Sequence, residues 1–99
     1  MARATIVYWR DIPTQVIVQA GRKRATVELP ERFIKTVDAC AMRTGAKDSD
    51  SYLEDWRKGE PSDCGDDLEA EAGRLAAEFE QAYDMARLKS LLETGGWDR

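Results

Sequence analysis

The strongest constraint on the fold is a series of three short extended segments in the first third of the chain. Residues 4–10, 15–20 and 25–29 are rich in β-branched and apolar side chains, and the last segment alternates apolar with polar residues. The links between these segments are too short for the crossover connection that parallel strands require. We therefore expect a three-stranded antiparallel sheet at the start of the chain.

Helical signals follow the predicted sheet. Pro30 suits the first turn of a helix, and apolar residues from Phe33 onward recur at helical spacing until Gly45, which favours a helix end. A short second helix is predicted before Gly59, and one long helix is predicted over residues 66–95. The expected fold class is α+β, with a three-stranded antiparallel sheet followed by three helices, the last of them long.

The chain length of 99 residues favours a single domain, residues 1–99. We expect the sheet and the first two helices in residues 1–59, a linker in residues 59–65 and the long helix in residues 66–95. The apolar residues of the long helix form one narrow seam, which would suit pairing with a second copy of the chain. A homo-oligomer through the C-terminal helix is therefore one expectation.

The charge of the chain is distributed unevenly. Residues 1–44 carry eight basic and four acidic residues, whereas residues 45–99 carry seven basic and fifteen acidic residues. One interpretation is that the two parts attract each other and keep the domain soluble. The alternative is that the basic part contacts an anionic partner.

The chain contains no histidine and only two cysteines, Cys40 and Cys64. Catalytic Cys–His and Ser–His pairs are therefore excluded, and two separated cysteines do not supply the four ligands of a zinc site. We expect no cofactor and no metal. A thiol-dependent enzyme is one alternative, with Cys64 as the nucleophile near a helix N-terminus, although Asp63 and Asp66 beside it oppose thiolate formation.

No segment of the sequence has the pattern of a membrane span or of a secretion signal. No apolar run exceeds the length of Ile6–Trp9, which is far shorter than the roughly 20 residues that a spanning helix needs. Two isolated cysteines also fit a reducing compartment better than a disulfide framework. These observations predict a cytoplasmic protein of bacterial type that does not bind a membrane.

A second alternative is DNA binding. Residues 22–58 resemble a ribbon-helix-helix repressor, a family that places the outward residues of its strand in the major groove of DNA. In this chain those residues would be Arg22, Arg24, Thr26 and Glu28. However, Asp48 and Asp50 would repel the phosphate that the family holds at the N-terminus of its second helix. Nucleic acid is therefore not the partner that we expect.

Several strings of the sequence are similar to the small family of virulence factor domains, which also occur within the larger conserved virulence factor C of staphylococci. Tyr8-Trp-Arg-Asp-Ile-Pro13 is the most specific string, and the similarity extends over about residues 2–70. The other strings of the same pattern are Val16–Val18, Gly21–Arg24, Glu28–Phe33 and Asp50–Trp56. The resemblance implies no catalytic residues. It implies an accessory role beside folate-dependent and corrinoid-dependent one-carbon enzymes.

The function that we expect is protein–protein interaction without catalysis. Tryptophan and arginine side by side at a strand end are typical of interface hot spots, and a basic turn would extend that surface. The predicted contact residues are Tyr8, Trp9, Arg10, Asp11, Arg22, Lys23 and Arg24. The alternative is that Trp9 belongs to the core and that Arg10 pairs with Asp11 or another neighbour.

Overall fold

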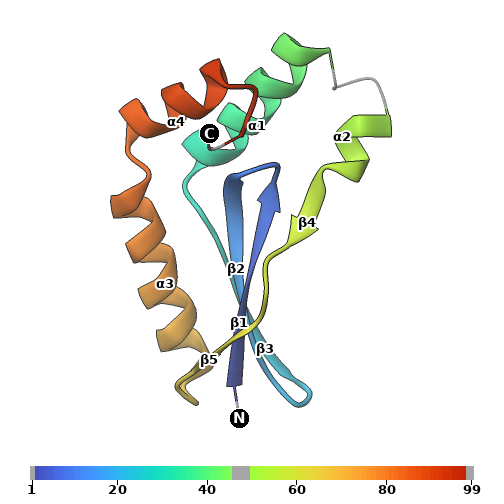
Figure 1. Cartoon of the computed structure of the whole chain (residues 1–99). Helices are drawn as coiled ribbons and strands as arrows, with labels where there is room; N and C mark the ends of the chain where they lie inside the picture. Colours follow the sequence, from blue (N-terminus) through green and yellow to red (C-terminus); the bar gives the residue numbers. More distant parts are fainter. Residues whose placement is uncertain (1, 46–49, 98–99) are drawn as a thin grey trace.

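Three antiparallel strands begin the chain in the computed structural model, which describes residues 2–45 and 50–97. β1 spans Ala2–Trp9, β2 spans Ile12–Ala20 and β3 spans Lys23–Glu28. Consecutive strands pair through short turns, with Ile6 opposite Val16 in the first pair. The predicted antiparallel pairing of these strands is confirmed, and Figure 1 shows the two hairpins at opposite ends of the sheet.

The sheet contains five strands rather than the expected three. β4 (Trp56–Lys58) and β5 (Ser62–Cys64) pair antiparallel with the second edge of β1, at residues 7–9 and 2–4 respectively. The strand order is β3-β2-β1-β4, with β5 also beside β1. The backbone groups on both edges of a covered strand need hydrogen-bond partners, and the segment after the second helix supplies them. The predicted linker over 59–65 therefore contributes a strand to the sheet.

The first two helices connect the hairpins to this segment. α1 spans Glu31–Thr44 and ends at Gly45, whose left-handed φ of 76° ends the helix as predicted. The second helix, α2, covers only Asp50–Glu54 and gives way to β4. The sequence prediction extended this helix too far, because pairing with β1 draws Trp56–Lys58 into the sheet.

The predicted long helix over residues 66–95 is in fact two helices. α3 spans Leu68–Ala82 and α4 spans Met85–Glu93. The Asp84 side chain accepts a hydrogen bond from the backbone N–H of Arg87 at 2.9 Å and so caps the start of α4. Ala86, which continues the predicted seam, is exposed, whereas Leu88 and Leu91 are buried. The bend at Tyr83 and Asp84 turns α4 back so that it packs on α1.

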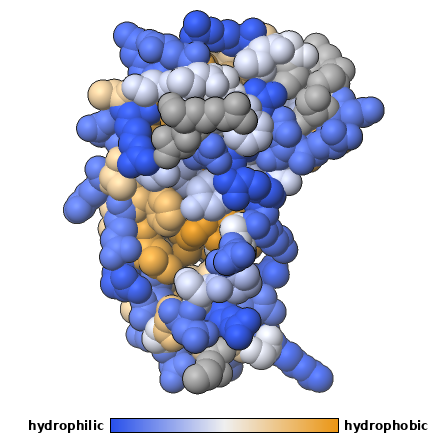
Figure 2. All heavy atoms as spheres, viewed as in Figure 1, coloured by the Kyte–Doolittle hydropathy of each residue, from blue (hydrophilic) through white to orange (hydrophobic). Residues whose placement is uncertain are grey.

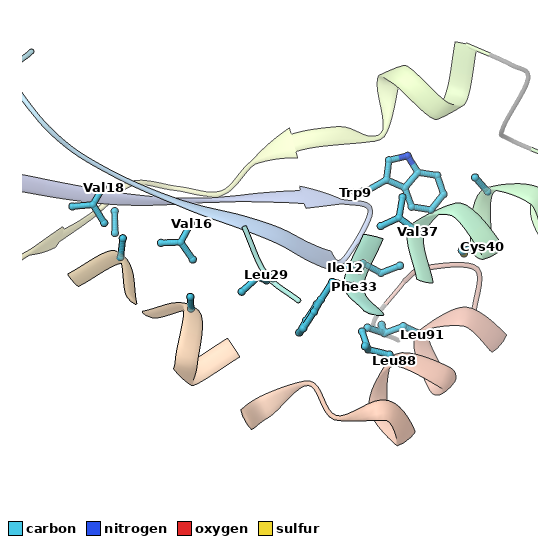
Figure 3. Packing of buried hydrophobic residues seen from close by; sticks show 14 of the residues in the cluster. Trp9, Ile12, Val16, Val18, Leu29, Phe33, Val37, Cys40, Leu88 and Leu91 are labelled. Atoms are coloured by element: carbon cyan, nitrogen blue, oxygen red, sulfur yellow. The ribbon is translucent and has the colours of Figure 1, made fainter. Parts of the chain in front are cut away.

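The hydrophobic core lies between one face of the sheet and the helices. α3 packs over β2 and β3 and buries its own residues Ala72 and Ala76. This part of its apolar seam therefore packs against the sheet of the same chain. Figure 3 shows the side chains from the sheet, α1 and α4 that meet at the other end of this core. Among the described residues, no helix is both long and apolar enough to cross a bilayer.

Candidate functional site

Trp9 ends β1 in the core of the protein. Its side chain has no exposed surface, and its indole N–H donates a hydrogen bond to the backbone carbonyl of Tyr52 at 2.9 Å. A buried indole needs such a partner, and here the partner lies in α2. Trp9 therefore belongs to the core rather than to an accessible contact surface.

Arg10 connects the end of β1 to distant parts of the chain. Its φ of 55° is uncommon for a residue with a side chain. Its Nε lies 2.9 Å from a carboxylate oxygen of Asp55, and its Nη1 donates to the carbonyl of Gly95 at 2.6 Å. The guanidinium also lies over the rings of Trp9 and Trp97. Only 12 % of its side chain is exposed, so these contacts leave little of Arg10 for a partner.

Asp11 and Arg57 form an ion pair on the surface beside Arg10. Arg57 Nη2 donates to Asp11 Oδ1 at 2.8 Å, and its Nε donates to the backbone carbonyl of Arg10 at 3.0 Å. The Arg57 guanidinium also lies 4.6 Å from the centroid of the Tyr8 ring. Pairing of β4 with β1 brings these side chains together, because Arg57 is opposite Tyr8 in the register.

A hollow of about 460 Å³ opens beside this ion pair. It is bounded by the end of β1, the turn after β4 and the end of α3. Its lining residues are Tyr8, Asp11, Arg57, Gly59, Glu60 and Tyr83. None of these residues is hydrophobic on the colour scale of Figure 2, so the orange surface that the figure shows between α3 and the strands is formed by other residues. We call this hollow the tyrosine hollow.

The backbone of Gly59 allows the hollow to form. Its N–H donates to the carbonyl of Ile6 at 2.8 Å, and a Cβ at this position would lie only 3.1 Å from the Tyr8 ring. The chain after β4 therefore passes very close to Tyr8. Partial burial and the nearby Tyr83 raise the pKa of Tyr8 above its ordinary value.

The basic turn lies at the opposite end of the sheet from the tyrosine hollow. Arg22, Lys23 and Arg24 are exposed at the β2–β3 turn, roughly one strand length of about 25 Å from the β1–β2 turn. Lys23 and Arg24 line a second hollow together with acidic residues at the start of α3. The structure therefore does not bring the two groups of predicted contact residues together on one surface.

The pKa of each cysteine is raised. Burial, followed by the nearby Glu71 carboxylate, raises the pKa of Cys64, and Arg74 only partly opposes this shift. Burial also raises the pKa of Cys40, which lies in the core. Both thiols are free. Within the described part of the chain, no group of three metal-ligating side chains is close enough together to hold a metal ion.

The residues of the DNA-binding alternative share the strand β3. Arg24, Thr26 and Glu28 are exposed there, and Arg22 precedes them in the turn. Asp50 starts α2 as an exposed acid, whereas Asp48 lies outside the described residues. The exposed face of β3 thus carries both charge signs.

A comparison with models of protein families identifies the family of this chain. A family model described as "Virulence factor" matches residues 7–92. The chain belongs to this family. The residues that line the tyrosine hollow of this virulence factor domain all lie within the matched range. No curated protein and no solved structure gives a significant match to the chain.

The sequence identified only part of the site in this virulence factor domain. It pointed to Tyr8 and Asp11, which do line the tyrosine hollow, but it missed Arg57, Glu60 and Tyr83. Those residues come from a segment predicted as helix and linker and from the break between α3 and α4. The Trp56-Arg57 pair repeats the aromatic–cation pattern of Trp9-Arg10, and this repetition is the sequence feature that could have pointed to Arg57.

Proposed function

We propose that this virulence factor domain is a non-enzymatic interaction protein whose partner docks at the tyrosine hollow. The observation that supports this proposal is that Tyr8 and Tyr83, from opposite ends of the sequence, line one open hollow with the Arg57–Asp11 ion pair. Tyrosine and arginine are enriched among the residues that dominate interface energies.

The partner that fits the hollow best presents a basic side chain. Both tyrosine rings already carry an arginine of this chain on one face: Arg57 lies over Tyr8, and the Arg87 guanidinium lies 4.1 Å from the centroid of the Tyr83 ring. These contacts follow the general attraction of cations to the faces of aromatic rings, which a basic side chain of a partner would share. Glu60 adds an exposed carboxylate to the lining, while Arg57 is already engaged with Asp11.

Two features of the chain lead us to prefer a binding role over catalysis. It has no histidine to act as a base, and the raised pKa of Cys64 keeps this thiol protonated near neutral pH. The carboxylates around Cys64 work in the same direction. These features argue against Cys64 as a nucleophile.

The family resemblance suggests where to look for the partner. It implies a role beside folate-dependent or corrinoid-dependent one-carbon enzymes, so we propose a cytoplasmic accessory protein of such an enzyme. A corrinoid-dependent methyltransferase from the same source is the first partner to test.

The test is calorimetric titration of the purified chain into that methyltransferase. Glu60→Lys should weaken binding by on the order of tenfold, because it places a positive charge where the partner's cation would bind. Glu93→Lys is the matched control: it makes the same charge change in α4, outside the hollow, and should leave binding unchanged. Equal effects of the two substitutions would contradict the proposed site.

A second measurement separates the chemistry of the hollow from the identity of the partner. In NMR titrations, a short arginine-containing peptide should shift the signals of Tyr8, Gly59 and Tyr83 more than a glutamate-containing peptide of the same length. If the arginine peptide binds but the methyltransferase does not, the partner class is wrong and the site stands. If neither peptide shifts these signals, the hollow is not a cation-binding contact.

A further inference from the structure

β3 is the edge strand of the sheet, and its outer backbone groups point away from the other strands. Among the described residues it pairs only with β2. Leu29, just after β3, donates its N–H to the carbonyl of Thr14 at 3.0 Å. In an antiparallel strand, the backbone N–H and C=O groups of alternate residues point to the same neighbouring strand. Because Leu29 bonds to β2, the residues between its alternates point their backbone groups away from β2. These outward residues are Arg24, Thr26 and Glu28.

The side chains of the same residues form a pattern that is complementary to itself. Thr26 lies midway between Arg24 and Glu28, and all three side chains are exposed on one face of the sheet. In an antiparallel pair of two β3 strands centred on Thr26, Arg24 of each copy lies opposite Glu28 of the other. The outward N–H and C=O groups then face each other in the same register. Opposite charges directly across two strands stabilise their pairing.

The helix above this edge leaves room for a second chain. α3 packs over β2 and β3, and its Glu71 carboxylate accepts a hydrogen bond from Gly65 on the β5 side. On a helix, Gly73 and Ala77 lie on the flank away from Glu71, which is the flank toward the β3 edge. Both are exposed, and nothing lies within 4 Å of a Cβ placed on Gly73. A neighbouring helix could therefore approach closely.

We propose that the domain forms a symmetric dimer by antiparallel pairing of two β3 strands around Thr26. Charged residues on an edge strand normally discourage pairing between molecules. Here the two signs are placed so that one register, and only that register, brings each arginine opposite a glutamate. The surface is separate from the tyrosine hollow, so the dimer and the proposed partner can be tested independently.

Exchange of the charges at Arg24 and Glu28 is the decisive test. Sedimentation equilibrium of the full chain should show a monomer–dimer equilibrium. Arg24→Glu and Glu28→Arg should each weaken the dimer by on the order of tenfold, because each places like charges opposite one another at two positions. The double exchange should restore it, and an equimolar mixture of the two single variants should form a heterodimer. Arg22→Glu is the matched control, since it makes the same charge change in the turn.

A backbone variant provides an independent check. Thr26→Pro removes one outward N–H on an edge strand, where proline is tolerated, and should abolish the dimer while circular dichroism remains that of the wild type. A wild-type chain that stays monomeric at every concentration overturns the proposal. Loss of the dimer in Arg22→Glu to the same degree as in Arg24→Glu, or failure of the double exchange to restore it, overturns the proposed register.

Discussion

The turns of the first two hairpins each contain one arginine but differ in the contacts that this arginine makes. Each contains one residue with positive φ: Arg10 at 55° in the β1–β2 turn and Gly21 at 60° in the β2–β3 turn. Glycine adopts this conformation at little steric cost, whereas arginine pays about 1 kcal/mol for it. Of these two turns, the one with a non-glycine residue at positive φ is therefore the β1–β2 turn, where other elements of the chain contact the sheet.

The contacts of Arg10 explain how that conformation is tolerated. The backbone N–H of Arg10 donates to the carbonyl of Asp55 at 3.0 Å, and its side chain bonds to Asp55 and to the Gly95 carbonyl. Arg22, in the other turn, is exposed. The comparison shows that the presence of an arginine in a turn does not by itself reveal the role of that residue. Arg10 stabilises the fold, and Arg22 lies on the open surface.

Arg10→Ala should be the most damaging substitution in this comparison. It removes a largely buried ion pair and a hydrogen bond, and it leaves Asp55 and the Gly95 carbonyl without their partner. We expect the free energy of unfolding to fall by about 3 kcal/mol, measured by urea denaturation. A loss below about 0.5 kcal/mol would show that the network around Arg10 does not stabilise the domain.

Gly96→Ala and Gly21→Ala compare the surroundings of the two turns. Gly96 has a φ of 92°, and a Cβ there would lie 3.1 Å from Arg10 Cδ and 3.3 Å from Cys40 Sγ. Gly21 has open space around the same position. We expect a loss of about 2 kcal/mol for Gly96→Ala, from strain and crowding, and about 1 kcal/mol for Gly21→Ala, from strain alone. Thermal melts with matched urea curves would measure both, and equal losses would contradict the difference in packing.

Arg57→Met should raise the pKa of Tyr8 further, because Arg57 is the group that lowers it against the effect of burial. Tyrosinate absorbance against pH, compared with Tyr8→Phe, would follow this group. A pKa that is raised on folding contributes stability below the ordinary value of 10.0, and this contribution is lost as pH rises through the folded pKa. An unchanged or lower pKa in Arg57→Met would contradict the stacked geometry.

Arg22→Ala should have the smallest effect. The side chain is exposed at the far turn, so the free energy of unfolding should change by less than about 0.5 kcal/mol. The same urea series that measures Arg10→Ala would measure it. A loss comparable to that of Arg10→Ala would remove the contrast between the two turns.

Local patterns in the sequence were sufficient for the first three strands and for α1. The alternation over residues 25–29 predicts a strand, and Pro30 and Gly45 predict the two ends of a helix. Each pattern depends on a few neighbouring residues, so it can be recognised without knowledge of the tertiary structure. The sequence contains no comparable local pattern for β4 and β5. Each has only three residues, and Ser62–Cys64 is polar, so these segments are strands because β1 offers them a partner.

The break between α3 and α4 had a similar origin. The apolar spacing continues through Ala82 and Ala86, and no glycine or proline lies between these two residues, so the sequence favoured one helix. The structure instead begins a new helix at the Asp84 cap, because Leu88 and Leu91 are buried only when α4 turns toward α1. The tyrosine hollow depends on this bend and on β4. Its lining could therefore not be assembled from local patterns, apart from Tyr8 and Asp11.

The hydrogen bonds from the Arg10 side chain to the Gly95 carbonyl and from the Asp11 backbone N–H to the Gly96 carbonyl join the tenth and eleventh residues to a loop some 85 positions later. During translation the first hairpin leaves the ribosome early, yet these acceptors are among the later residues to emerge. A nascent chain that stalls before residue 95 would hold a formed hairpin whose turn lacks its closing contacts, and such a chain would be an early target for proteases.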